Sequence, residues 1–144
     1  MGLFNPNAIF LSDVNLLLQF AILVILILSF YFQRRRIYLK HGVTIAIAVT
    51  LHTIAIFGIM LPSLFALTTS FGTSLVRSLV VLPHAILGSL VEILGLYLVL
   101  AWALHRREIK VCSENKRFMK PTLILWLLEL AIGIYVYIVL YVPI

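Results

Sequence analysis

The sequence has few charged residues and one cysteine, and each shortage excludes a class of protein. Only 11% of the 144 residues are charged, whereas 63% are hydrophobic, and the mean hydropathy is +1.16. Soluble globular domains carry about 25% charged residues, so the composition predicts a membrane protein. Because Cys112 is the one cysteine, the chain cannot form an internal disulfide and has no CxxC redox or metal motif.

Local motifs of soluble enzymes are also missing. The sequence contains no nucleotide-binding glycine loop, no HExxH helix and no serine nucleophile elbow. It shows none of the inverted repeats of large secondary transporters. Residues 1–7 carry no basic group before the first apolar run, so they do not predict a cleavable signal peptide. These absences favour a function other than soluble-enzyme catalysis.

Four long hydrophobic segments dominate what is present. They cover residues 10–32, 42–67, 76–104 and 121–142. Each can cross a hydrocarbon core of about 30 Å at about 1.5 Å per residue. We therefore predict an all-α integral membrane protein, a single domain in which four transmembrane helices form an antiparallel bundle. The connections are too short to hold a second domain.

Basic residues are placed unevenly around these segments. Of the 11, four lie between the first and second segments and six between the third and fourth, while Arg77 falls on the opposite side. Cytoplasmic loops carry an excess of lysine and arginine, so this asymmetry predicts cytoplasmic basic loops in a cell membrane, with both termini outside. The same placement indicates that the +6 net charge sets the orientation of the chain in the membrane and attracts membrane lipids as partners. It argues against a nucleic-acid interface.

Titratable side chains inside the apolar segments point most directly to a functional site. His52 lies in the second segment, His84 and Glu92 in the third, and Glu129 in the fourth. A charged group at the bilayer centre costs at least about 2.5 kcal/mol, so such residues usually face a bundle interior and mark a function. Counting along each helix puts His52, Glu92 and Glu129 in one layer near the midplane and His84 about 12 Å farther out. We therefore predict two separate polar layers.

Helical periodicity gathers polar and small residues on one face of each segment, and we expect these faces to form the interior. The faces are Ser12, Asn15 and Gln19; His41, His52 and Ser63; His84, Gly88, Glu92 and Gly95; and Thr122, Trp126, Glu129, Gly133 and Tyr137. His41 and His105 are expected to be solvated at the cytoplasmic edge, and Asp13 to reach water at the outer boundary. Pro62 is expected to bend the end of the second segment, because it cannot donate to the Gly58 carbonyl.

The two carboxyl groups and the imidazoles allow several kinds of chemistry. His52, His84, Glu92 and Glu129 are candidate ligands for a transition metal such as iron, manganese, copper or zinc. Two of them, His52 and His84, are candidate haem ligands, although their unequal heights disfavour coordination of one iron from opposite sides. The same groups can pass protons, or can act only as hydrogen-bonded pairs that join helices. The residues alone leave these alternatives open.

Several residues together carry a resemblance to a known family. They are Asn15 in the first segment, His41 after the basic turn, His84, and the stretch 116–141 with Trp126, Gly133 and Tyr137. In this combination the chain resembles the YozB-type, CtaM-like family of small multi-histidine membrane proteins. Two other histidines of the family are replaced here, one near Pro62 and Ser63 and one at Asn115. The resemblance implies an accessory factor in the maturation of haem-copper oxidases.

Residues and resemblance lead to one expectation and two alternatives. We expect an accessory or assembly protein of a respiratory membrane complex that handles metal, haem or protons through His52, His84, Glu92 and Glu129. A first alternative is a structural small subunit of a larger membrane enzyme complex. A second is a haem-bearing electron carrier.

Overall fold

Long helices make up the described part of the chain. The computed structural model describes residues 10–70, 75–105 and 115–141, so Cys112 lies outside the described residues. The elements are α1 (Phe10–Arg34), α2 (Tyr38–Ala55), the π-helical segment η1 (Ile56–Met60), α3 (Leu61–Ser70), α4 (Leu75–His105) and α6 (Lys116–Tyr141). Within these ranges four helical rods are long and apolar enough to cross a membrane. The predicted multi-pass helical bundle is therefore confirmed.

The helices extend beyond the apolar segments that predicted them. α1 continues to Arg34, and α6 begins at Lys116, before the apolar run that starts at Pro121. Long basic side chains can lie along the end of a helix while their charged groups reach the headgroup region. Hydropathy therefore located the spans but underestimated the lengths of the helices.

A tight turn connects α1 to α2. The Ile37 amide donates to the Phe32 carbonyl and the Arg36 amide to the Gln33 carbonyl, both at 3.0 Å. This pair of bonds is the usual C-terminal cap of a helix that ends in a left-handed residue. Arg36 occupies that position, with φ of 59°, where glycine is more common. The cap sets α1 and α2 as an antiparallel hairpin.

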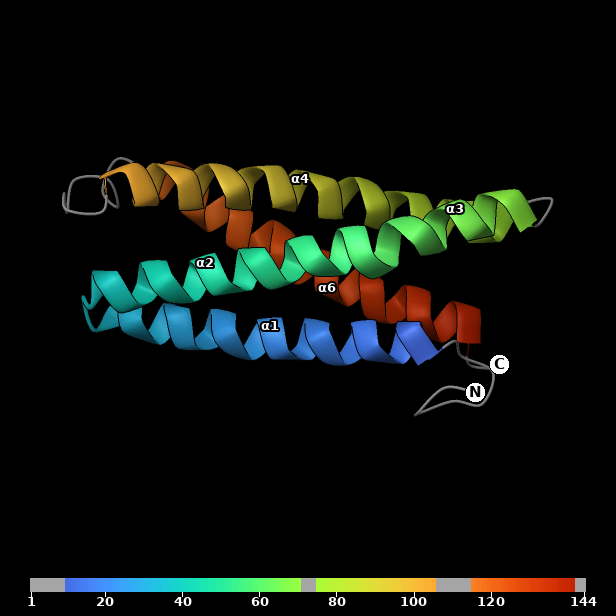
Figure 1. The fold of residues 1–144 in the computed structure, drawn as a ribbon, viewed down its shortest axis with the longest axis horizontal. Helices are drawn as coiled ribbons and strands as arrows, with labels where there is room; N and C mark the ends of the chain where they lie inside the picture. The colour runs from blue at the N-terminus through green and yellow to red at the C-terminus, as the bar shows by residue number, and fades with distance from the viewer. Residues whose placement is uncertain (1–9, 71–74, 106–114, 142–144) are drawn as a thin grey trace.

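The helix α6 crosses the bundle obliquely. In Figure 1 it lies near α4 at the end that holds the α1–α2 turn and near α1 at the opposite end. At the first end the rings of Tyr97 and Phe118 pack 5.7 Å apart. At the second end the hydroxyls of Ser12 and Tyr141 are 2.9 Å apart. Residues of α1, α4 and α6 on this second side, Tyr141 among them, line a cavity that is described below.

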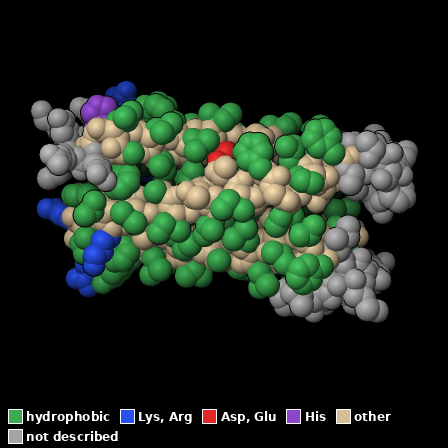
Figure 2. Space-filling view, viewed as in Figure 1, with side chains coloured by type: hydrophobic (Ala, Val, Ile, Leu, Met, Phe, Trp, Pro, Cys, Tyr) green, Lys and Arg blue, Asp and Glu red, His purple; other side chains and the backbone are tan. Residues whose placement is uncertain are grey.

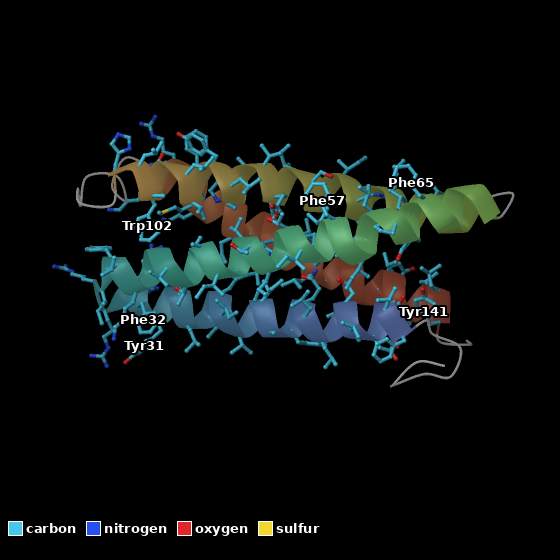
Figure 3. The ribbon with its side chains drawn as sticks, in the orientation of Figure 1. Tyr31, Phe32, Phe57, Phe65, Trp102 and Tyr141 are labelled. Atoms are coloured by element: carbon cyan, nitrogen blue, oxygen red, sulfur yellow. The ribbon has the colours of Figure 1, made fainter. Side chains whose placement is uncertain are left out.

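The outer surface is that of a membrane protein. Figure 2 shows hydrophobic side chains over the visible face and lysine and arginine gathered at one end. Soluble monomers rarely expose apolar patches larger than a few hundred Å². Aromatic side chains stand near both ends: Trp102 with Tyr31 and Phe32 at one, and Tyr141 with Phe65 at the other (Figure 3). These positions suit anchoring at the two headgroup regions.

The predicted polar stripe of the second span ends at η1. His41 and His52 are buried, whereas Ser63 is exposed. A π-helical turn holds one residue more than an α-helical turn, so the residues that follow are rotated by about 100°. Pro62 is the second residue after η1 and cannot donate a hydrogen bond to Gly58. The disturbance expected from Pro62 is present, and it shifts the stripe that periodicity extended to Ser63.

Two glycines allow α2 and α4 to approach closely. A Cβ added at Gly95 would lie 3.0 Å from Cγ2 of Val49, and one added at Gly42 would overlap the indole of Trp102. Small residues at such interfaces let helix backbones pack together in membranes.

The Gly42 contact gives a first prediction. Gly42→Ala is expected to lower the free energy of unfolding by about 1 kcal/mol, because the indole of Trp102 must move to accept the methyl group. Gly58→Ala is the matched control, since a Cβ there meets no atom within 4 Å. It should be neutral or slightly stabilising. Equilibrium unfolding in detergent compares the two variants, and equal stabilities would contradict the packing argument.

Candidate functional site

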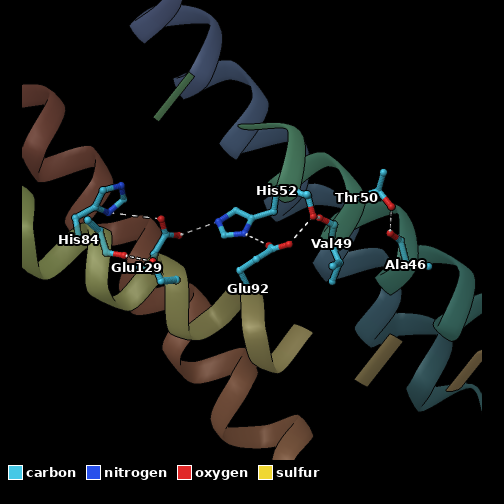
Figure 4. A network of polar contacts seen from close by, with 10 residues as sticks. Ala46, Val49, Thr50, His52, His84, Glu92 and Glu129 are labelled. Atoms are coloured by element: carbon cyan, nitrogen blue, oxygen red, sulfur yellow. Dashed lines mark hydrogen bonds and ion pairs between the residues drawn. The ribbon is translucent and has the colours of Figure 1, made fainter. Parts of the chain in front are cut away.

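His52 lies at the centre of the bundle. The α2 helix presents it with 0% of its surface exposed. Its Nδ1–H donates to Oε2 of Glu92 on α4 at 2.9 Å, and its Nε2 lies 4.0 Å from Oε2 of Glu129 on α6. The imidazole packs against Trp126, with ring centroids 5.2 Å apart. The prediction that His52, Glu92 and Glu129 share one layer is therefore confirmed (Figure 4).

Glu92 is held by two groups of α2. Besides its bond with His52, it accepts a hydrogen bond from the Thr53 hydroxyl on its other oxygen. His52 and Thr53, which are consecutive residues of α2, thus each bond one oxygen of the Glu92 carboxyl group on α4. Thr53 was not predicted as a site residue, because one threonine in an apolar helix gives no functional signal. Its hydroxyl also lies 2.9 Å from the Val49 carbonyl of its own helix.

Glu129 lies between the two histidines. Its Oε1 is 3.5 Å from Nδ1 of His84, while its Oε2 faces His52 at 4.0 Å. The prediction of two separate layers is therefore wrong. Counting residues along the helices estimates the depth of each backbone position but not the reach of a side chain. The Glu129 side chain is long enough to link His84, the outer histidine, to His52, the inner one. His84, Glu129, His52 and Glu92 form one line, which we call the His–Glu line (Figure 4).

Several atoms of this line lack a hydrogen bond. Among the described residues, neither oxygen of Glu129 has a hydrogen-bond partner, and the same holds for Nδ1 of His84 and Nε2 of His52. The distances of 3.5 and 4.0 Å are too long for direct hydrogen bonds. A gap of this size is where a bridging water or a small side-chain rotation completes a polar chain.

Two glycines leave space for the line. A Cβ at Gly133 would lie 2.9 Å from Cε1 of His84, and one at Gly88 would lie 3.7 Å from Oε1 of Glu129. The first contact is tighter than normal packing allows, so Gly133 is required for the position of the His84 ring. The second is ordinary contact. Both residues were predicted on inward faces, and the structure places both beside the site.

A cavity of about 230 Å³ opens beside His84 and Glu129. Its walls come from α1, η1, α3, α4 and α6, and its polar groups include Asn15 and Gln19 of α1. Gln19 is 8% exposed, and neither atom of its amide has a hydrogen-bond partner within the described ranges. Sequence reasoning placed Gln19 on an inward face but did not include it in the site. The signal in the sequence that could have added it was a single glutamine within an apolar segment.

Asp13 is not at a water-filled boundary. Its side chain is 0% exposed, and the Tyr137 hydroxyl donates to its Oδ1 at 2.5 Å. The prediction that Asp13 reaches water is wrong because α6 leans across α1 at this end and covers it. Periodicity on one helix cannot show how another helix tilts.

His41 is also buried, against the prediction of a solvated edge residue. It is 9% exposed, and its Nδ1 lies 2.7 Å from the hydroxyl and 3.0 Å from the carbonyl oxygen of Ser29 on α1. These contacts join the two helices of the hairpin. His105, in contrast, is exposed as predicted. The tight turn explains the difference, because it brings α1 against the first turns of α2.

The arrangement does not fit a metal or haem centre. In the described part of the chain, no group of three or more His, Cys, Asp or Glu side chains is placed to hold a metal ion. The carboxylate of Glu129 stands between His52 and His84, so the two imidazoles face it instead of a common point. The cavity is smaller than the roughly 300 Å³ at which pockets for drug-sized ligands begin, and haem is larger than such ligands. Metal and haem binding remain predictions without support from this geometry.

Comparison with known proteins adds no relative. No family model, curated protein or solved structure matches the chain. Fold and site therefore define its class by themselves: a multi-pass helical membrane protein with a His–Glu line beside a mostly apolar cavity that holds a few polar groups. The resemblance to the YozB-type family stays a prediction.

Proposed function

We propose that this chain is a membrane accessory protein that holds and transfers protons through the His–Glu line. One observation carries the proposal: four titratable side chains from three helices follow one another at nitrogen–oxygen distances of 2.9, 4.0 and 3.5 Å. Imidazole both accepts and donates protons near neutral pH, and carboxyl groups at membrane depth serve proton relays. Alternating imidazole and carboxyl groups are suited to passing a proton along the line.

The two ends of the line differ. At one end, Thr53 and His52 pair both oxygens of Glu92. At the other end, His84 and Glu129 meet the cavity. Protons therefore enter and leave on the cavity side, which suits a protein that exchanges protons with a bound molecule or a partner better than a channel.

A respiratory membrane complex of the haem-copper oxidase type is the setting we propose. The resemblance carried by Asn15, His41 and His84 supports it, and the basic residues between the spans support a cell membrane with cytoplasmic basic loops. The tagged protein, purified from its own membranes in mild detergent, should carry oxidase subunits with their haem absorbance. Purification without them would contradict this setting.

The role of Glu129 gives a second prediction. Glu129→Gln should keep the shape of the side chain while removing the carboxyl group that links His52 to His84. In lipid nanodiscs, infrared spectra recorded across a pH titration should show a carboxyl band for the wild type that shifts in heavy water. Glu129→Gln should lose that component completely.

The control for this prediction is Glu114→Gln, which changes a glutamate outside the apolar segments in the sequence. It should leave the band in place. A band from Glu129 that does not respond to pH would support the alternative of a structural small subunit, in which the same residues only join helices.

A further inference from the structure

The cavity beside the His–Glu line has the composition of a ligand site. Atoms without a hydrogen-bond partner among the described residues include both amide atoms of Gln19, Oδ1 of Asn15 and both oxygens of Glu129, and all three residues line it. Leaving a buried polar group unpaired costs about 1–3 kcal/mol. Several such groups around one space indicate that a bound molecule supplies the missing bonds.

The charges of the residues that line the cavity indicate which kind of polar group a ligand can place in it. None of the described residues that line it is lysine or arginine, and Glu129 contributes a carboxyl group. An anionic head, such as a phosphate or a fatty-acid carboxylate, would be buried without a cation and next to an acid. An uncharged head meets no such cost.

The residues that form the cavity walls indicate the size and polarity of the rest of the ligand. Apart from the polar groups, the lining is mostly aliphatic, as at Ile56, Ile59 and Leu64 of the second span. A volume of about 230 Å³ accommodates a compact head of one or two rings. The polar groups stand on two sides, with Gln19 on α1 and the pair His84 and Glu129 on α4 and α6. A rigid head with hydrogen-bonding atoms at opposite ends satisfies both sides.

We propose that this cavity binds the head group of a quinone-type lipid. Such a head is uncharged and compact, carries two oxygen atoms at opposite ends of a ring, and continues into an apolar tail. The Gln19 amide hydrogen-bonds to one oxygen, and the pair His84 and Glu129 faces the other. The inference builds on the proposed function, since the oxygen near Glu129 lies within hydrogen-bonding reach of the cavity end of the His–Glu line.

Binding can be measured with the two tryptophans as reporters. Trp126 lies beside His52 in the core, whereas Trp102 stands near the basic end of the bundle. The probe is a benzoquinone with a decyl tail, titrated into protein in nanodiscs that carries Trp102→Phe. Quinones quench indole fluorescence at short range, so we expect saturable quenching of Trp126. Decanol, which has the tail without the quinone head, should not compete.

The decisive variants change the cavity. Gln19→Leu should weaken binding at least about tenfold, the equivalent of one lost hydrogen bond of about 1.4 kcal/mol. Gln33→Leu, the same change toward the other end of α1, should leave the affinity unchanged. Ala85→Leu narrows the cavity without altering a polar group and should weaken binding similarly. It keeps the proposal testable if Gln19→Leu does not fold.

Three results would overturn the quinone site. Quenching that never saturates, or that is equal in all variants, would mean partition into lipid. Saturable binding that survives in both Gln19→Leu and Ala85→Leu would place the quinone elsewhere. Equal competition by decanol would mean that the head is not recognised. The infrared response of Glu129 is measured without quinone, so the proposed proton function and this inference fail independently.

Discussion

His52→Ala is expected to lower the free energy of unfolding by about 3–5 kcal/mol, the range for breaking a buried ion pair by removing one partner. The change leaves Glu92 buried with its Thr53 bond and without its imidazole donor. It also removes the ring that packs on Trp126, at a position with 0% exposure. Loss of packing and loss of a hydrogen bond to a buried carboxyl group therefore act in the same direction.

The control for His52→Ala is His105→Ala, which makes the same change at an exposed position near the basic end. It should alter stability by less than about 0.5 kcal/mol. Titration of the detergent-solubilised protein with a denaturing detergent, followed by circular dichroism, measures both variants. If the two variants are equally stable, the His–Glu line does not hold the bundle together.

A double-mutant cycle separates the hydrogen bond from the packing. Combining His52→Ala with Glu92→Ala should cost less than the sum of the single changes, with a coupling of about 0.5–3 kcal/mol for residues in contact. The pair His52 and Thr50 provides a comparison, because the Thr50 hydroxyl bonds the Ala46 carbonyl of its own helix. The losses of unfolding free energy caused by changing His52 and Thr50 to alanine should therefore be additive. Additivity for His52 and Glu92 would mean that the 2.9 Å contact contributes nothing.

Much of the fold could be predicted from the sequence, because one physical requirement dominates it. A chain in lipid must satisfy its backbone hydrogen bonds internally, so long apolar runs become helices. The helix ends were less predictable: Arg34 and Lys116 belong to helices although hydropathy excludes them. An irregularity near the end of the second span followed from Pro62, but its form as a π-helical segment, which rotates Ser63 away from His52, did not.

The inner part of the site was predictable for a related reason. A helix rises regularly, so counting residues placed His52, Glu92 and Glu129 at one depth, and their contacts confirm it. Features that depend on the tilt of α6 were not predictable. The cavity with Gln19 arises where α6 crosses toward α1, and the same crossing covers Asp13. The pattern of polar and apolar residues within one helix contains no information about the angle at which α6 crosses α1.

Tyr137→Phe is expected to lower the free energy of unfolding by about 2 kcal/mol. The variant keeps the ring that packs on Tyr141 and removes the hydroxyl that donates to Asp13 at 2.5 Å. Hydrogen bonds between membrane helices average about 0.6 kcal/mol, because an unpaired group often finds another partner. The larger value expected here follows from the acceptor, a fully buried carboxyl group, for which a lost bond costs about 1.5–3 kcal/mol.

Tyr135→Phe tests whether this loss belongs to the hydrogen bond. Tyr135 lies on the same helix with 57% of its surface exposed, so removing its hydroxyl should change stability by less than about 0.5 kcal/mol. In an Asp13→Asn background, Tyr137→Phe should lose most of its effect, since an amide accepts a weaker hydrogen bond than a carboxylate. If Tyr137→Phe costs no more than the average of about 0.6 kcal/mol, the contact between α1 and α6 rests on packing alone. The oblique position of α6, and with it the cavity beside Glu129, would then depend on the apolar core and not on Asp13.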